Sequence, residues 1–141
     1  MRVFLDANVL FSAAQHGSPI RQLVDRLSGH AAAVTSDYAW TEAERNVAAK
    51  RPDWIAGLRQ LRGSVEFVPT ASDCGPVELD AADRPILGAA IAARCTRLLT
   101  GDFRHFARLM GREVGGVKIV SARMLAGELG AKAGEDGHPR A

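Results

Sequence analysis

Four carboxylates stand at positions in this sequence where they could act together on one substrate. Asp6 and Asp102 follow apolar stretches at residues 3–5 and 98–99, whereas Asp83 and Glu42 lie at the start of one helical stretch and within another. Strand ends and helix starts meet at the carboxyl edge of a parallel α/β sheet, where ligands bind. Carboxylates gathered there repel one another, and a hard divalent cation is the usual compensation. The pattern therefore predicts a metal site that acts on phosphate esters.

Each of these acids also has an ordinary structural interpretation. Asp6 could serve only as the N-cap of a helix that continues from Asn8. Glu42 could be a solvated side chain like Glu44, which is rotated by about 200° around the same helix. The joint placement of four acids at matching points favours the metal site over a set of unrelated caps and surface charges.

Two further acids and two histidines need an assignment. Asp80 and Asp83 both precede a helix, whose positive N-terminal end favours acids. We expect Asp83 to point into the cleft and Asp80 to be the outer cap. His16 and His105 have no partner at a metal-ligand spacing, so we interpret both as surface residues.

The elements that must position these side chains alternate between strand and helix. Pro19, after the capping residue Ser18, begins one helix, and Ser36 or Asp37 caps the next. Apolar spacing predicts strands at residues 2–5, 31–35, 65–68, 97–100 and 117–120, and helices that start near residues 8, 19, 37, 52, 82, 103 and 122. This alternation predicts a three-layer α/β/α sandwich around a central, mostly parallel, five-stranded sheet.

The composition fits one globular domain. The chain has 141 residues, of which 47% are hydrophobic, and a net charge of +2. We assign residues 1–129 to the domain and expect residues 130–141, which lack an apolar period, to form a disordered tail. No apolar run approaches the ~20 residues of a membrane span, and residues 3–5 are too short for a signal peptide. Cys74 and Cys95 have no metal-type spacing and are interpreted as reduced thiols, so we expect a cytoplasmic protein without membrane contact.

With these segments in hand, the chain resembles the PIN domain family of metal-dependent ribonucleases. The segments that carry the resemblance are residues 3–10, 36–46, 83–90 and 98–106, in that order. The resemblance implies a first strand near the centre of the sheet, Mg²⁺ or Mn²⁺ as cofactor, and endonucleolytic cleavage of single-stranded RNA. It makes the metal-binding and catalytic acids Asp6, Glu42, Asp83 and Asp102.

The resemblance also assigns supporting residues and partners. Asn8 and Thr100 become groups that position the acids or a phosphate. Apart from the resemblance, the fork geometry of arginine makes Arg84 and Arg104, at the rim of the expected site, candidates for holding flanking RNA phosphates. Many small members resemble toxins of VapC-type toxin–antitoxin pairs, which implies an antitoxin protein as partner. Ala7 departs from the pattern, because a hydroxyl-bearing residue is frequent there.

Two other functions remain open at this stage. A phosphatase of the haloacid-dehalogenase type also places an Asp after its first strand, but it needs a second Asp two residues later, where this chain has Asn8. A non-catalytic module of the same fold could bind RNA or a protein, although it would not need all four acids. Trp40, Trp54 and Ile55 on outer helices could form a homodimer interface.

Overall fold

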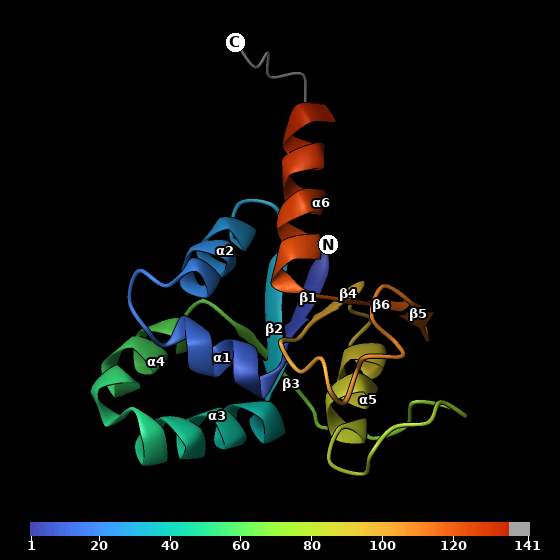
Figure 1. Cartoon of the computed structure of the whole chain (residues 1–141), viewed down its shortest axis with the longest axis horizontal. Helices are drawn as coiled ribbons and strands as arrows, with labels where there is room; N and C mark the ends of the chain where they lie inside the picture. Colours follow the sequence, from blue (N-terminus) through green and yellow to red (C-terminus); the bar gives the residue numbers. More distant parts are fainter. Residues whose placement is uncertain (136–141) are drawn as a thin grey trace.

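The computed structural model describes residues 1–135, and their side chains up to Gly130 (Figure 1). Its elements follow one another along the chain as β1 (Arg2–Leu5), α1 (Ala7–Ala13), α2 (Pro19–Leu27), β2 (Ala32–Ser36), α3 (Asp37–Lys50), the 3₁₀ helix η1 (Pro52–Trp54), α4 (Ile55–Arg62), β3 (Glu66–Val68), α5 (Arg84–Ala92), β4 (Arg97–Leu99), β5 (Glu113–Val114), β6 (Val117–Val120) and α6 (Ala122–Glu135).

The sheet has the strand order β3-β2-β1-β4-β6-β5. All neighbours are parallel except β5 and β6, so the predicted three-layer, mostly parallel architecture is confirmed, with β1 near the centre. The short strand β5 is a sixth strand beyond the five expected. It forms a hairpin with β6 through Gly115 and Gly116, whose φ angles of 57° and 85° suit a tight two-residue turn.

The helices cover both faces of this sheet. Helices α1 to α4 pack together on one face, where α6 also contacts α2. Helix α5, which follows β3 and precedes β4 along the chain, packs on the other face (Figure 1). The central strands are accordingly apolar and buried, with Phe4, Leu5, Leu98 and Leu99 fully inaccessible. The carboxyl ends of β1 and β2 therefore open onto the starts of α1 and α3, which is the edge predicted to hold the acids.

The helix starts follow local capping chemistry. The Ser18 hydroxyl accepts from the N–H of Arg21, and the Ser36 hydroxyl accepts from the N–H of Ala39. Pro19 occupies the first turn of α2, where its missing N–H costs nothing. Of the two candidate caps for α3, Ser36 therefore takes the role and Asp37 does not.

Three expectations about elements need correction. Residues 103–110 form turns and a bend rather than a short helix, because their backbone hydrogen bonds, such as those from Phe106 to Asp102 and from Leu109 to Phe106, do not form a continuous helical series. The stretch from Pro52 begins as a 3₁₀ turn before α4. Helix α6 continues to Glu135, beyond the expected end at residue 129, and the rest of the expected tail, residues 136–141, lies outside the described residues.

Several side chains bear on the other sequence-based expectations. Cys74 and Cys95 are buried free thiols, as predicted. Trp40 is only 3% exposed and packs against Phe67 beneath the Arg62 guanidinium, so it belongs to the core and not to an outer dimer surface. Within residues 1–135, no helix is both long and apolar enough to cross a membrane.

Candidate metal centre

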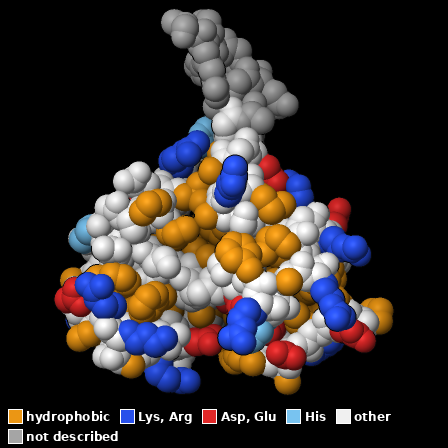
Figure 2. All heavy atoms as spheres, in the orientation of Figure 1, with side chains coloured by type: hydrophobic (Ala, Val, Ile, Leu, Met, Phe, Trp, Pro, Cys, Tyr) orange, Lys and Arg blue, Asp and Glu red, His pale blue; other side chains and the backbone are white. Residues whose placement is uncertain are grey.

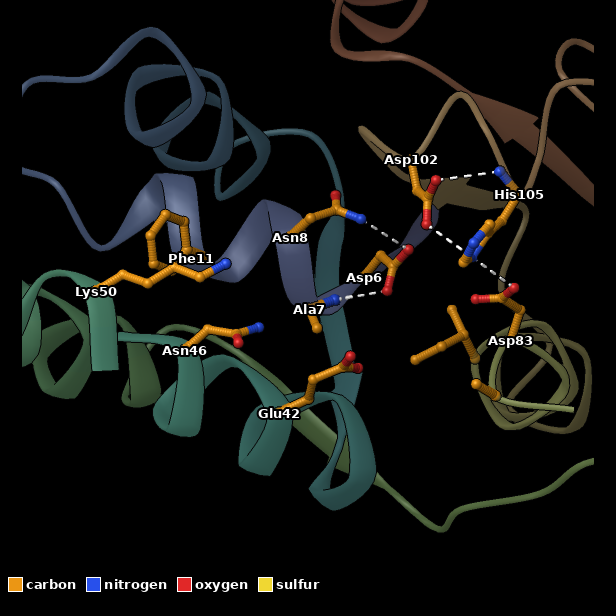
Figure 3. A pocket seen from close by; sticks show the side chains of 12 residues that line it. Asp6, Ala7, Asn8, Phe11, Glu42, Asn46, Lys50, Asp83, Asp102 and His105 are labelled. Atoms are coloured by element: carbon orange, nitrogen blue, oxygen red, sulfur yellow. Dashed lines mark hydrogen bonds and ion pairs between the residues drawn. The ribbon is translucent and has the colours of Figure 1, made fainter. Parts of the chain in front are cut away.

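The four predicted acids line one cavity at the carboxyl edge of the sheet (Figure 3). Asp6 ends β1 and Asp102 follows β4, and these strands are direct parallel neighbours. Asp83 enters from the start of α5, and Glu42 comes from the first half of α3. The cavity has a volume of about 260 Å³, and its wall is completed by Ala7, Asn8, Phe11, Asn46, Lys50, Ala82, Ile86 and His105.

Asp6 lies at the floor of this cavity and is held rigidly. Its Oδ1 accepts from the backbone N–H of Ala7 at 2.7 Å, which makes it the N-cap of α1. Its Oδ2 accepts from the Thr100 hydroxyl at 2.8 Å and from the Asn8 amide at 3.2 Å. Asp6 therefore caps α1 through Oδ1 and also lines the cavity, so the capping role does not exclude its predicted role as a metal ligand.

Burial makes Asp6 a carboxylate that resists ionisation. The residue is 5% exposed, and desolvation raises its pKa from 3.8 to about 6. The hydrogen bonds from Thr100 and Ala7 oppose this rise, whereas the negative charges of Glu42 and Asp83 add to it. A cation in the cavity would favour the ionised form of Asp6 and so offset the cost of its burial.

Thr100 and Asn8 link Asp6 to the turn that carries Asp102. The Thr100 hydroxyl donates to Asp6 and accepts from the N–H of Asp102 at 3.0 Å. The Asn8 carbonyl oxygen accepts from the N–H of Gly101 at 2.8 Å, while its amide nitrogen donates to Asp6. Both residues predicted to position the acids therefore make the bonds that such a role requires.

The substitution Thr100→Val should lower the free energy of unfolding by about 1–3 kcal/mol, because the shape is kept but the N–H of Asp102 loses its acceptor. Loss of the hydroxyl should also raise the pKa of Asp6 further, so the destabilisation should be larger at neutral pH than at pH 4. Urea unfolding at the two pH values would measure this. Thr41→Val, on the exposed surface of α3, is the matched control; equal losses in both variants would refute a specific role for Thr100.

Asp83, Asp102 and His105 form the opposite wall. His105 Nδ1 lies 2.9 Å from Asp83 Oδ2 and 3.0 Å from Asp102 Oδ2 (Figure 3). The contact with Asp83 is short but lacks hydrogen-bond geometry, so the buried Asp83 Oδ2 has no hydrogen-bond partner within the described part of the chain. Burial raises the pKa of Asp83, and interaction with Asp83 and then Asp102 raises the pKa of His105.

The helix α3 supplies the remaining wall from one face. Glu42, Asn46 and Lys50 follow at intervals of four residues and all line the cavity. Glu44 points elsewhere and lines a separate groove between α3 and α4. The sequence left open whether Glu42 faces the other acids, and the structure places it in the wall of their cavity.

Sequence reasoning missed His105 and misplaced Asp80. His105 is exposed, as predicted for a surface residue, but it also contacts two of the predicted acids, and its spacing of three residues from Asp102 was the available signal. The backbone carbonyl of Asp80, not its carboxylate, accepts from the N–H groups that begin α5. Arg84 donates to the carbonyls of Gly75 and Val77, so its guanidinium stabilises that loop, while Arg104 is exposed beside His105.

The donor set fits a divalent cation. Four carboxylates converge with little intrinsic compensation, and Lys50 is the only Lys or Arg among the residues that line the cavity. The buried Asp83 Oδ2 has His105 Nδ1 nearby but makes no hydrogen bond within the described part of the chain, and a cation would satisfy it. Asp6, Glu42, Asp83 and Asp102 are the residues that would hold it.

Comparisons with known proteins support the fold alone. No protein-family profile and no curated protein matches the sequence. Among solved structures, the VapBC2 complex from Rickettsia felis, bound to a DNA fragment from their promoter, contains a similar chain. The TM-score is 0.64 at 16% sequence identity, covering 86% of this chain and 98% of that one. This likeness agrees with the PIN-type fold that the sequence resemblance implies.

Proposed function

We propose that this protein is a Mg²⁺- or Mn²⁺-dependent endoribonuclease that cleaves single-stranded RNA. The observation that carries the proposal is the convergence of Asp6, Glu42, Asp83 and Asp102 on one cavity, where a buried oxygen of Asp83 makes no hydrogen bond within the described residues. The two buried acids of this set, Asp6 and Asp83, are costly to keep ionised unless a cation binds, and the exposed Glu42 faces the same cavity.

The side chains have separate tasks in this proposal. When bound, a divalent cation lowers the pKa of water and neutralises charge that develops on a phosphoryl group. Asp6 and Asp102 would hold the cation from fixed positions, because Thr100 and Asn8 bind the carboxylate of Asp6 and the backbone N–H groups of the turn that carries Asp102. Glu42 reaches in from α3 without a hydrogen-bond anchor in the described contacts, so it is free to orient a water molecule.

The rim favours a polyanionic substrate. Figure 2 shows acidic and histidine side chains in the lower middle of one face, with Lys and Arg side chains to both sides. Lys50 lines the cavity itself, and Arg104 lines the adjoining groove with Arg108. Cations around an acidic centre can hold the phosphates that flank the scissile bond.

The structural likeness to a chain of VapBC2 supports a narrower proposal. We assign this protein to the toxins of VapC-type pairs, with an antitoxin protein as its partner. Co-purification with the product of an adjacent small reading frame, and loss of RNA cleavage in the complex, is the expected result for such a pair.

Two glutamates on α3 give a sharp test of the nuclease. Glu42→Gln should reduce the rate of RNA cleavage at least about a hundredfold, because it removes a charge from the centre. Glu44→Gln removes the same charge from the same helix, outside the cavity, and should cleave like the wild type. The assay follows a mixed-sequence single-stranded RNA with Mg²⁺, Mn²⁺ or EDTA.

The outcomes separate the function from its alternatives. Cleavage that needs the metal and fails only in Glu42→Gln supports the nuclease. RNA binding without cleavage in any metal would favour a non-catalytic module. Equal activity of the two variants would remove Glu42 from the site.

A further inference from the structure

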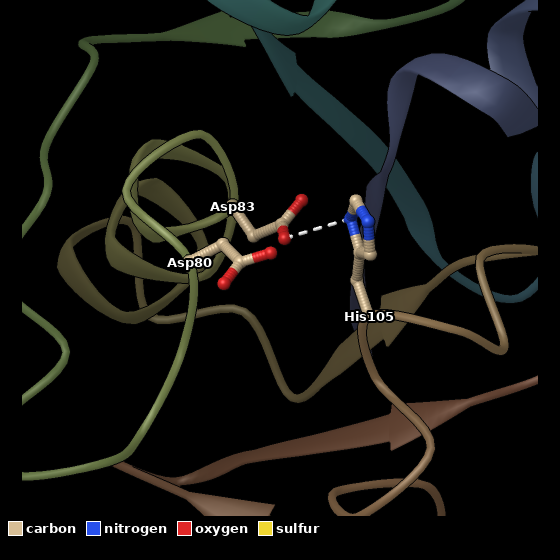
Figure 4. A group of neighbouring side chains, drawn as sticks. All are labelled: Asp80, Asp83 and His105. Atoms are coloured by element: carbon tan, nitrogen blue, oxygen red, sulfur yellow. Dashed lines mark ion pairs between the residues drawn. The ribbon is translucent and has the colours of Figure 1, made fainter.

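One histidine nitrogen faces two carboxylates at the edge of the proposed nuclease site. We propose that Asp80, Asp83 and His105 form a second cation position, which takes a transition metal of the zinc class in preference to Mg²⁺ (Figure 4). The position shares Asp83 with the four-carboxylate centre. Its role in RNA cleavage rests on the proposed function, whereas its affinity for metal does not.

The single hydrogen that His105 Nδ1 can carry cannot serve two carboxylate oxygens well. An imidazole nitrogen carries at most one hydrogen, yet His105 Nδ1 lies 2.9 Å from Asp83 Oδ2 and 3.0 Å from Asp102 Oδ2. Asp83 is 9% exposed, and its Oδ2 is left without a hydrogen bond within the described chain. A buried carboxylate oxygen without a donor is costly, and a cation bound between Asp83 and His105 would remove that cost.

The spacing of the three side chains suits one ion. One ligand atom from each of Asp80, Asp83 and His105 can be chosen so that all lie within 4.8 Å of one another. Two ligands that bind a cation at about 2.1 Å lie about 3 Å apart at a right angle and about 3.4 Å apart in tetrahedral geometry. The separation of 2.9 Å between Asp83 and His105 is near the lower of these values, and small side-chain movements would bring all three ligands onto one ion.

The elements that carry the three ligands converge from two directions. Asp80 and Asp83 flank the turn that opens α5, whereas His105 lies on the turn segment after β4 and faces them (Figure 4). The carboxylate of Asp80 is exposed and takes no part in capping α5, because its backbone carbonyl does so instead. The side chain is therefore available to a ligand that enters from solvent.

The donor chemistry sets the preference among metals. Mg²⁺ selects oxygen ligands and rarely accepts imidazole, whereas the zinc class of borderline cations accepts both imidazole and carboxylate. Asp6, Glu42 and Asp102 offer oxygen ligands only, whereas His105, which lines the edge of the same cavity, offers a nitrogen beside Asp83. The two positions are thus chemically unlike, and His105 is the residue that distinguishes them.

Calorimetric titration of the tag-free, full-length protein with Zn²⁺, in excess Mg²⁺, tests the proposal. The wild type should bind Zn²⁺ despite the Mg²⁺. Asp80→Asn and His105→Gln should each weaken this binding about tenfold or more, as expected when a group at a metal site is lost. Glu78→Gln is the matched control, because Glu78 is an exposed acid of the same loop whose ion pair, among the described side chains, is with Arg108 at 3.5 Å, and its loss changes the charge equally.

Co²⁺ in place of Zn²⁺ gives a second readout that does not depend on activity. Its visible absorption should change in His105→Gln, because a nitrogen ligand is lost. Zn²⁺ affinity that is unchanged in His105→Gln, or reduced as much by Glu78→Gln as by Asp80→Asn, would overturn the second position. So would complete displacement of Zn²⁺ by Mg²⁺.

Parallel RNA assays in Mg²⁺ keep the two proposals apart. If the protein cleaves RNA but His105→Gln binds Zn²⁺ as tightly as the wild type, the nuclease proposal stands and the second position is refuted. Zn²⁺ binding that requires Asp80 and His105, in a protein that cleaves no RNA in any metal, would establish the position and refute the nuclease.

Discussion

Replacing Asp6 by Asn should make the metal-free protein more stable while abolishing metal-dependent RNA cleavage. Burial raises the pKa of Asp6 from 3.8 to about 6, so the ionised side chain costs the folded state about 3 kcal/mol at neutral pH. The amide carries no charge but fits the donors of Thr100 and Asn8 less well, which returns about 1 kcal/mol. The net gain in free energy of unfolding should be about 2 kcal/mol, or about 5 °C in Tm.

The gain should depend on pH in a defined direction. Below pH 3.8 the carboxyl group is protonated in both folded and unfolded protein, so its ionisation costs nothing. As the pH rises from 3.8 to about 6, the unfolded chain ionises first and the wild type loses stability relative to Asp6→Asn. Above about pH 6 both states are ionised and the difference should stay constant. Unfolding by urea in EDTA, at several pH values, measures this curve.

Addition of Mg²⁺ or Mn²⁺ should reverse the order of stability. The wild type should gain stability with metal concentration, because the cation binds the folded state only. Asp6→Asn should gain little, and its cleavage rate should fall about a thousandfold or more, since a central anionic ligand is lost. A variant less stable than the wild type in EDTA at neutral pH would contradict the argument from burial. Retained cleavage would contradict the metal centre.

Gly57→Ala should destabilise the protein more than other small substitutions on its surface helices. An added Cβ at Gly57 would overlap the backbone carbonyl of Ala14, where α4 crosses the end of α1. Backbone cannot rotate away as a side chain can, so the two helices must separate. Overpacking of this kind costs about 3 kcal/mol, a large part of a typical domain's stability.

One arginine stabilises the close crossing of α4 and α1. Arg21 of α2 donates from Nη1 to the carbonyls of both Ala13 and Gly57, so three helices meet at one guanidinium. Separation of α4 from α1 should weaken these bonds as well. Because α1 begins at Asp6, the shift should also reduce metal affinity.

Gly127→Ala is the control for this prediction. Gly127 lies at an exposed position of α6 with no atom near the place of a new Cβ. Alanine there should stabilise the protein by about 0.5–1 kcal/mol, through its higher helix propensity. Thermal unfolding of the two variants should therefore give shifts of opposite sign. Similar Tm values for Gly57→Ala and the wild type would refute the tight crossing.

The sequence predicted most of the elements because their signals are local. The caps Ser18 and Ser36 act on N–H groups three residues away, and the apolar run before Asp6 marks a strand buried on both faces. The turn segment at residues 103–110 and the hairpin strand β5 escaped prediction. The first lacks a continuous series of helical backbone bonds although a carboxylate caps its start, and the second is a two-residue strand too short to show a period.

For the site, the sequence by itself determined that acids stand at the ends of β1 and β4 and beside α5, since each follows from where one element stops. Only the tertiary structure decided which of their neighbours matter. The Thr100 hydroxyl reaches Asp6, which lies 94 positions earlier in the sequence, and His105, on the turn segment after β4, contacts Asp83 at the start of α5. The same packing buries Trp40, and it turns Glu42 into the cavity while Glu44 faces a separate groove. Capping and periodicity depend on residues a few positions apart, whereas these contacts depend on how distant elements pack, and no short stretch of sequence records that.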